Sequence, residues 1–337
     1  MATPGEAGLE KMKTALVTLI LLLAASFFTS RRLSPPGRAA VFAGYLLLYA
    51  FLFPLLAWLP LYLSADFSRR EEYTERFLEN IYSSRSGERQ SLPLNGDGLI
   101  AEEDYKPGTS GKRRLVILGD SFAAGFGLDF EETLGARLQE QLGSRWQVIN
   151  GAFFGTNAEM QVEFFFRKLA KYEPASILVR HRMDDVLPLD DWYYLGEAAD
   201  IMVKYAPHWP RGLKNFFLRR ETMLMREKFW KQYRADTAGV LERNMLAHYR
   251  RLGEYAAGKG ISVLLVPDKC PGGYEAVCEA AGNEAARQNW ELLDPAEKAD
   301  LSSPEMLLPD GHPSAAANRL LARLISGRLS GRTPGRN

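Results

Sequence analysis

Apolar residues follow three different patterns along the 337-residue chain. Two long runs near the start, 14–30 and 39–64, carry no charged residue at all. A stretch rich in charge, Gly, Pro and Ser follows, and after it short apolar runs alternate with segments of helical periodicity. This pattern predicts a membrane region at 1–66, a juxtamembrane helix followed by a linker or surface wrap at 67–112, and a folded domain at 113–330.

The two uncharged runs predict transmembrane helices. The second run exceeds the roughly 20 apolar residues that cross a bilayer, whereas a buried core helix rarely runs so far without charge. The first run is either a second span or a signal peptide, whose basic start would be Lys11 and Lys13. Arg31, Arg32 and Arg38 lie between the runs. The positive-inside rule then places this short loop in the cytoplasm and the C-terminal part outside it, anchored in an inner or plasma membrane.

The alternation beyond residue 113 predicts an α/β domain with a parallel sheet covered by helices on both faces. Strands are expected at 115–118, 146–149, 176–179, 261–266 and 291–293, and helices at 132–142, 158–172, 242–257 and 314–329. Sites in such sheets form at the carboxyl ends of the strands. An aromatic and basic insertion at about 187–236 interrupts the alternation. It is either a helical subdomain with a solvated basic face or a lid, a binding element for an anionic polymer or a membrane-surface element.

The overall charge and the cysteine content limit the partners and ligands that the sequence predicts. Basic and acidic residues number 42 and 41, so no overall field favours nucleic acid as a partner. Cys270 and Cys278 flank a Pro-Gly-Gly turn and form either a local disulfide in an oxidising compartment or two separate thiols. No histidines or further cysteines cluster near them, and we therefore expect neither a metal site nor a cofactor.

A serine follows the first predicted strand directly, in LVILGDSFAAGFGL. Taken alone, Ser121 is either a helix cap or a nucleophile at the end of a strand. A nucleophilic serine needs a base, a carboxylate that orients the base, and donors for the oxyanion. His312 lies in PDGHPS just before the last predicted helix, and Asp310 precedes it by two positions. These two residues are the candidate base and its orienting carboxylate.

The motifs together resemble the GDSL/SGNH hydrolase superfamily, whose members are serine esterases and acyltransferases. GDSF matches the first block of the family and puts Ser121 in the nucleophile's place, while VINGAFFGTN puts Gly155 at the oxyanion glycine. Asp310 and His312 match the last block, and the resemblance covers roughly 114–329. It implies a three-layer αβα, flavodoxin-like fold. It also implies an acyl-enzyme at Ser121, with the oxyanion held by the N–H groups of Ser121 and Gly155.

One departure from the family pattern concerns the oxyanion hole. The third block of the family carries an Asn whose amide donates to the oxyanion, but ILVRHRMDDV has Asp184 at that position. An ionised carboxylate accepts hydrogen bonds only. Three alternatives follow: Asp184 is protonated, Arg182 substitutes as a donor, or the third donor is absent.

A second departure concerns the last block. Only Gly311 separates Asp310 from His312, where two residues are commoner in the family. Asp294 and Asp300 are alternative residues that could orient the histidine.

These features predict a membrane-anchored serine esterase or O-acyltransferase that acts on acyl esters of envelope carbohydrate, with acetyl as the expected group. The carbohydrate substrate, and a link to envelope polysaccharide machinery, are implied by the resemblance alone. The alternative is a non-catalytic module of the same fold that binds polysaccharide or scaffolds an envelope assembly complex.

Overall fold

A computed structural model describes residues 92–108, 111–188, 226–270 and 272–330, together with the isolated positions 36, 37, 44 and 223. The chain divides into two compact units, Met1–Arg70 with Asp190–Lys228 and Glu71–Leu189 with Phe229–Asn337. The predicted spans at 14–30 and 39–64 and most of the insertion at 187–236 lie outside the described residues. Within the described ranges, no helix is both long and apolar enough to cross a membrane.

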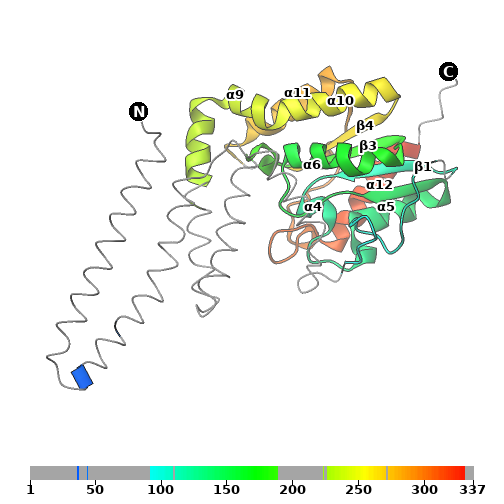
Figure 1. The fold of residues 1–337 in the computed structure, drawn as a ribbon, viewed down its shortest axis with the longest axis horizontal. Coiled ribbons are helices and arrows are strands. Elements are labelled where there is room, and N and C mark those ends of the chain that lie inside the picture. Colours follow the sequence, from blue (N-terminus) through cyan, green and yellow to red (C-terminus); the bar gives the residue numbers. More distant parts are fainter. Residues whose placement is uncertain are drawn as a thin grey trace. The chain divides into compact units, whose positions relative to one another are not determined.

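The second unit is built on a five-stranded parallel sheet with strand order β2-β1-β3-β4-β5 (Figure 1). All four pairings are parallel, which confirms the predicted parallel sheet. The strands are β1 (Arg113–Leu118), β2 (Trp146–Asn150), β3 (Ser176–His181), β4 (Ser262–Pro267) and β5 (Glu291–Leu292). Since β1 lies inside the sheet, between β2 and β3, residues that follow β1 lie beside the carboxyl ends of two neighbouring strands.

Helices cover both faces of this sheet, as predicted (Figure 1). Within the described residues, the α-helices with defined bounds are α4 (Ser121–Ala124), α5 (Leu134–Leu142), α6 (Ala158–Phe164), α9 (Thr237–Leu241), α10 (Ala247–Lys259), α11 (Glu275–Arg287) and α12 (Ala315–Ser330). Shorter helical turns continue or connect them: Phe130–Glu132, Gly143–Arg145, Phe165–Leu169, Ala170–Tyr172, Met183–Val186, Glu242–Leu246, Pro295–Glu297 and Pro304–Met306.

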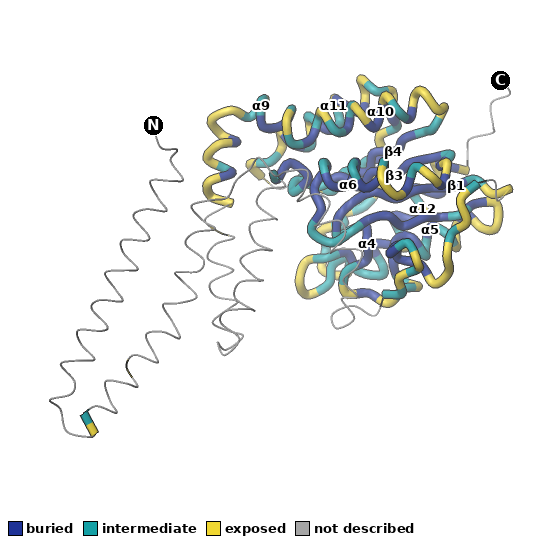
Figure 2. Tube along the Cα trace, in the orientation of Figure 1, coloured by how far each residue is buried: buried dark blue, intermediate teal, exposed yellow. Residues whose placement is uncertain are grey.

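The two faces of β1 belong to two different hydrophobic clusters. Leu115 and Ile117 pack in the cluster that includes α5 and α12. Val116 and Leu118 pack in the cluster that includes α6, α10 and α11. Successive side chains of a strand point to opposite faces. A strand covered on both faces is typically apolar along its length, which explains the unbroken run 115–118. Figure 2 shows that β1 and β3 are buried along most of their length.

The segment 92–108 packs against the sheet along the outer edge of β2. Ile100 is 4 % exposed and forms an antiparallel bridge with Asn150. The hydroxyl of Tyr105 donates to the carbonyl of Val148 at 3.0 Å. The second part of the stretch predicted as a linker is therefore a strap over this edge strand.

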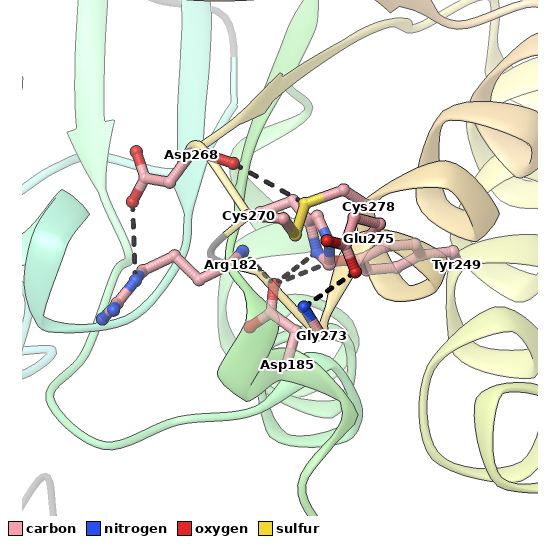
Figure 3. The surroundings of a disulfide bond; sticks show 9 residues. Arg182, Asp185, Tyr249, Asp268, Cys270, Gly273, Glu275 and Cys278 are labelled. Carbon is pink, nitrogen blue, oxygen red and sulfur yellow. Dashed lines mark hydrogen bonds and ion pairs between the residues drawn. A yellow bond between two sulfur atoms is a disulfide. The ribbon is translucent and has the colours of Figure 1, made fainter. Parts of the chain in front are cut away.

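Cys270 and Cys278 form a disulfide, with a Cα–Cα distance of 6.2 Å (Figure 3). The bond joins the loop that follows β4 to helix α11. Of the two alternatives for these cysteines, the structure has the local disulfide.

Candidate active site

Ser121 is the first residue of α4, at the carboxyl end of β1. The N-cap of this short helix is Asp120, whose carboxylate accepts from the backbone N–H of Phe122 at 2.9 Å. Gly125 ends the helix at φ +97°, and a Cβ there would collide with Thr133. Because Asp120 supplies the cap, the Ser121 hydroxyl is not needed for it. This removes the helix-cap explanation of the serine.

His312 meets Ser121 although the two lie far apart in the sequence. Its Nε2 is 3.0 Å from Ser121 Oγ. The histidine sits in a loop before α12, where the backbone N–H of Leu308 donates to the His312 carbonyl at 2.7 Å. The imidazole stacks on the ring of Phe126, with centroids 4.5 Å apart and planes 25° apart, and Phe122 lies tilted against it at 5.0 Å. The structure thus places the predicted nucleophile and base in hydrogen-bond contact.

Asp310 lies next to the imidazole but is shared between two partners. Its Oδ1 is 3.2 Å from His312 Nδ1, and the same oxygen accepts from the His312 backbone N–H at 3.1 Å. Within the described residues, Nδ1 makes no hydrogen bond of good geometry. The backbone hydrogen bond from His312 lowers the pKa of Asp310, which is 48 % exposed. The carboxylate is ionised and close, but the turn holds it off the Nδ1–H axis.

The two alternative orienting carboxylates are engaged elsewhere. Asp294 accepts from the backbone N–H of Ala296 at 2.8 Å, at the start of a short helical turn. Asp300 accepts from the backbone N–H of Ser302 at 3.0 Å. Both carboxylates cap local turns, so Asp310 is the better candidate.

Gly155 lies in the loop between β2 and α6, at φ +70°. This loop is tied to the turn before Ser121. The backbone N–H of Phe153 donates to the Gly119 carbonyl at 3.0 Å, and the Thr156 hydroxyl donates to the same carbonyl at 3.1 Å. Asn157 caps α6 and also donates to the Leu187 carbonyl at 2.7 Å. The loop that carries the predicted oxyanion glycine is therefore fixed to its neighbours on both sides.

Asp184 and Asp185 have different surroundings. The side chain of Asp184 is 23 % exposed, and its Oδ2 lies 3.8 Å from Arg182 Nη2. Asp185 is buried, and its Oδ2 accepts from Tyr249 Oη at 3.0 Å and lies 2.9 Å from His181 Nδ1 (Figure 3). The sequence motifs did not single out this buried network. Asp185 anchors the turn Met183–Val186, whereas Asp184 stays at its surface.

A cluster of charged side chains lies around the turn that carries Ser121. Arg182 contacts the carboxylate of Asp120 at 3.0 Å. It also lies 3.5 Å from the carboxylate of Asp268 (Figure 3). Arg180 is 3 % exposed in its side chain and donates to Asp268 at 2.9 Å. Arg182 was predicted only as a substitute oxyanion donor, and Arg180 and Asp268 were not predicted. A charged residue inside the apolar run ILVRH was the available signal for Arg180.

Burial controls the ionisation of Asp120. Burial raises the pKa of this carboxyl to about 6, with Arg182 acting to lower it and Asp185 and Asp268 acting to raise it. The residue beside the candidate nucleophile therefore changes its charge at mildly acidic pH.

A pocket of about 130 Å³ lies near the charged cluster, with Arg180 and Asp268 in its lining, but neither Ser121 nor His312 lines it. Phe122 and Pro313, the chain neighbours of that pair, both line it. The part of the chain that the structure describes contains no group of three or more His, Cys, Asp or Glu side chains arranged to hold a metal ion.

The sequence matches no protein-family model and no curated protein. Among solved structures it is similar to TesA, with 20 % identity, a TM-score of 0.42 and coverage of 64 % of this chain and 98 % of that one. It is also similar to a lipase/acylhydrolase from Enterococcus faecalis, with 17 % identity, a TM-score of 0.42 and coverage of 67 % and 100 %. A third is the esterase EstA from Pseudoalteromonas sp., with 15 % identity, a TM-score of 0.42 and coverage of 65 % and 97 %.

Proposed function

We propose that this chain is a serine-dependent esterase or acyltransferase of the GDSL/SGNH type. The single observation that carries the proposal is the 3.0 Å contact between Ser121 Oγ and His312 Nε2 at the carboxyl end of β1. A hydroxyl at this distance from an imidazole nitrogen can pass its proton to the ring as it attacks a carbonyl.

The reaction proceeds in two steps. His312 Nε2 takes the Ser121 proton while Oγ bonds to the ester carbonyl carbon, and the carbonyl oxygen becomes an oxyanion. The C–O bond to the alcohol then breaks, and the alcohol leaves with the proton from His312. Water or a sugar hydroxyl next gives its proton to His312 as its oxygen bonds to the acyl carbon. The bond from Ser121 Oγ to that carbon then breaks, and His312 returns the proton to Oγ.

The oxyanion has two candidate backbone donors. The N–H of Ser121 lies in the first turn of α4, where N–H groups lack intrahelical acceptors, and the N–H of Gly155 lies in the adjoining loop. Asp184 offers a carboxylate where the family has an amide, and Arg182 is already engaged by Asp120 and Asp268. We therefore propose a hole with two donors. Loss of one donor costs about 10² to 10³ in rate in a well-studied protease, which leaves room for useful activity.

We further propose that the enzyme is membrane-anchored and faces away from the cytoplasm. The two uncharged runs at 14–30 and 39–64 and the arginines between them support this orientation. The Cys270–Cys278 disulfide also supports it, because such bonds persist in oxidising compartments.

As substrates we propose short acyl esters, with acetyl first, carried on envelope carbohydrate. The short acyl group, like the carbohydrate, follows from the family resemblance of the motifs. A functional link to envelope polysaccharide machinery rests on the same resemblance.

The test is covalent labelling of the full-length chain with a fluorophosphonate probe, followed by hydrolysis of an activated acetate ester. We expect the wild type to be labelled at Ser121, and Ser121→Ala to lose both labelling and hydrolysis. Ser303→Ala is the matched control, because that side chain makes no capping hydrogen bond at its helical turn. An unlabelled wild type that also fails to hydrolyse the ester contradicts the proposal.

Asp184 is the one observation that favours a non-catalytic module binding polysaccharide or scaffolding an assembly complex. In that case Ser121→Ala leaves the function in cells and binding to the polymer unchanged. The same variant therefore separates the two functions.

A further inference from the structure

The carboxylate of Asp268 lies between two arginines that reach the Ser121 turn from β3. Arg180 lies in β3, and Arg182 directly follows the last strand residue in extended backbone, so side chains two positions apart here leave the same side. Arg180 Nη2 donates to Asp268 Oδ1 at 2.9 Å, and Arg182 Nε lies 3.5 Å from Asp268 Oδ2. One carboxylate thus bridges two guanidinium groups at the carboxyl end of the sheet.

Each arginine holds one side of the nucleophile turn. Arg182 Nη1 donates to Asp120 Oδ2 at 3.0 Å, on the N-terminal side of Ser121. Arg180 Nη1 donates to the Phe122 carbonyl at 3.1 Å, on its C-terminal side. The Arg182 guanidinium also lies 3.4 Å from the centroid of the Phe122 ring. The residues immediately before and after Ser121 are therefore both fixed from β3.

The short length of α4 explains why this support is needed. The helix has four residues, and the N–H groups of Gly125 and Phe126 both donate to the Ser121 carbonyl. A helix so short leaves its remaining carbonyls without intrahelical donors. Arg180 supplies the donor for Phe122.

We propose that Asp268 is a positioning residue for the reaction of Ser121. Its negative charge keeps Arg180 and Arg182 side by side, and the two arginines set the orientation of the turn from Asp120 to Phe122. Asp268 itself touches neither the Ser121 hydroxyl nor His312 in this arrangement. The catalytic consequence rests on the proposed function, whereas the effect on the turn does not.

The test replaces Asp268 by Asn in the full-length chain. We expect kcat for an activated acetate ester to fall on the order of 10-fold to 100-fold with KM changed less than about twofold, because small misplacements of reacting groups cost rate more than binding. Fluorophosphonate labelling of Ser121 should slow by a similar factor. Asp268→Glu keeps the charge and should recover more of kcat than Asp268→Asn does.

Amide hydrogen exchange supplies a measurement that needs no activity. Asp268→Asn should speed exchange in the peptide 119–128, which contains α4. Asp236→Asn is the control, because Asp236 is exposed, caps α9 and, within the described residues, pairs with Arg243 at 3.4 Å. If Asp268→Asn does not fold, Arg180→Lys keeps a charge but loses the guanidinium geometry and should show the same two effects.

Unchanged kcat, labelling rate and exchange in a folded Asp268→Asn protein would overturn the proposal. So would an Asp268→Glu protein no more active than Asp268→Asn. If the wild type lacks labelling and hydrolysis, the proposed function fails, and the exchange rates alone decide whether Asp268 holds the turn.

Discussion

Asp310 shares one carboxylate oxygen between the imidazole of His312 and the backbone N–H of the same residue. With one residue between them, the carboxylate forms a tight local turn and cannot align fully with Nδ1–H. The stacked ring of Phe126 then carries part of the task of orienting the imidazole. Asp310 should therefore contribute less to the rate than the aspartate does in enzymes whose carboxylate is buried and well aligned with the histidine.

The resulting prediction compares two variants. We expect His312→Ala to lower kcat/KM for an activated ester about 10³-fold or more, and Asp310→Ala to lower it only about 10-fold to 100-fold. Steady-state kinetics at one pH measures both. Equal losses in the two variants would mean that Asp310 orients the histidine as strongly as a buried carboxylate does.

The raised pKa of Asp120 predicts that the stability of the folded protein falls as the pH rises. Burial raises its pKa from an ordinary value of 3.8 to about 6, so the folded protein binds this proton more tightly than the unfolded chain. The stability that Asp120 contributes is complete below the unfolded pKa and is lost as the pH rises through about 6. Asp120→Asn resembles the protonated form at every pH and should lack this loss.

Urea unfolding at about pH 4 and about pH 7 measures the effect. Between the lower and the higher pH, the free energy of unfolding of the wild type should fall by up to about 3 kcal/mol relative to that of Asp120→Asn. Asp236→Asn, at an exposed position, should track the wild type. If the wild type and Asp120→Asn differ in free energy of unfolding by the same amount at both pH values, the pKa of Asp120 is not raised by folding.

Residues near the site differ in how far the sequence could predict them. Ser121 and His312 each lie in a short motif, one at the end of a strand and one before a helix. These motifs already predicted that the two side chains lie close together. Arg180 and Asp268 meet only because β3 and β4 are neighbours in the sheet, with Arg180 paired in register to Val266. No motif links them, so sequence alone could not pair them.

At the scale of elements, the strands were predicted best. An unbroken apolar run bounded by polar residues is typical of a strand buried on both faces, and each of the five predicted strands overlaps an observed one. Helix ends shifted by a residue or two where caps such as Thr133 fixed them. The expected helix at 158–172 continues beyond α6 as a π-helical turn, Phe165–Leu169, and a further short turn.

Helix α11 was missed for a physical reason. Its buried residues include Val277, Ala281 and Ala285, which are too small to make a clear apolar stripe. The disulfide joins the first turn of this helix to the loop that follows Asp268.

At the scale of the whole molecule, the alternation of strands and helices in the sequence predicted the α/β fold of the second unit, which carries the candidate site. The predicted spans at 14–30 and 39–64 lie outside the described residues and remain predictions. What the structure adds to the domain plan is the strap 92–108, which the composition alone had marked as a surface stretch.

The strap has a consequence for aggregation. A bare outer strand presents unpaired N–H and C=O groups that can recruit the same strand of another copy. Ile100 and Tyr105 occupy that edge of β2, while β5 on the opposite side has only two residues. A fragment that starts at 113 should therefore self-associate as its concentration rises in light scattering, whereas one that starts at 92 should stay monomeric. Equal behaviour of the two fragments would show that the strap does not protect the sheet.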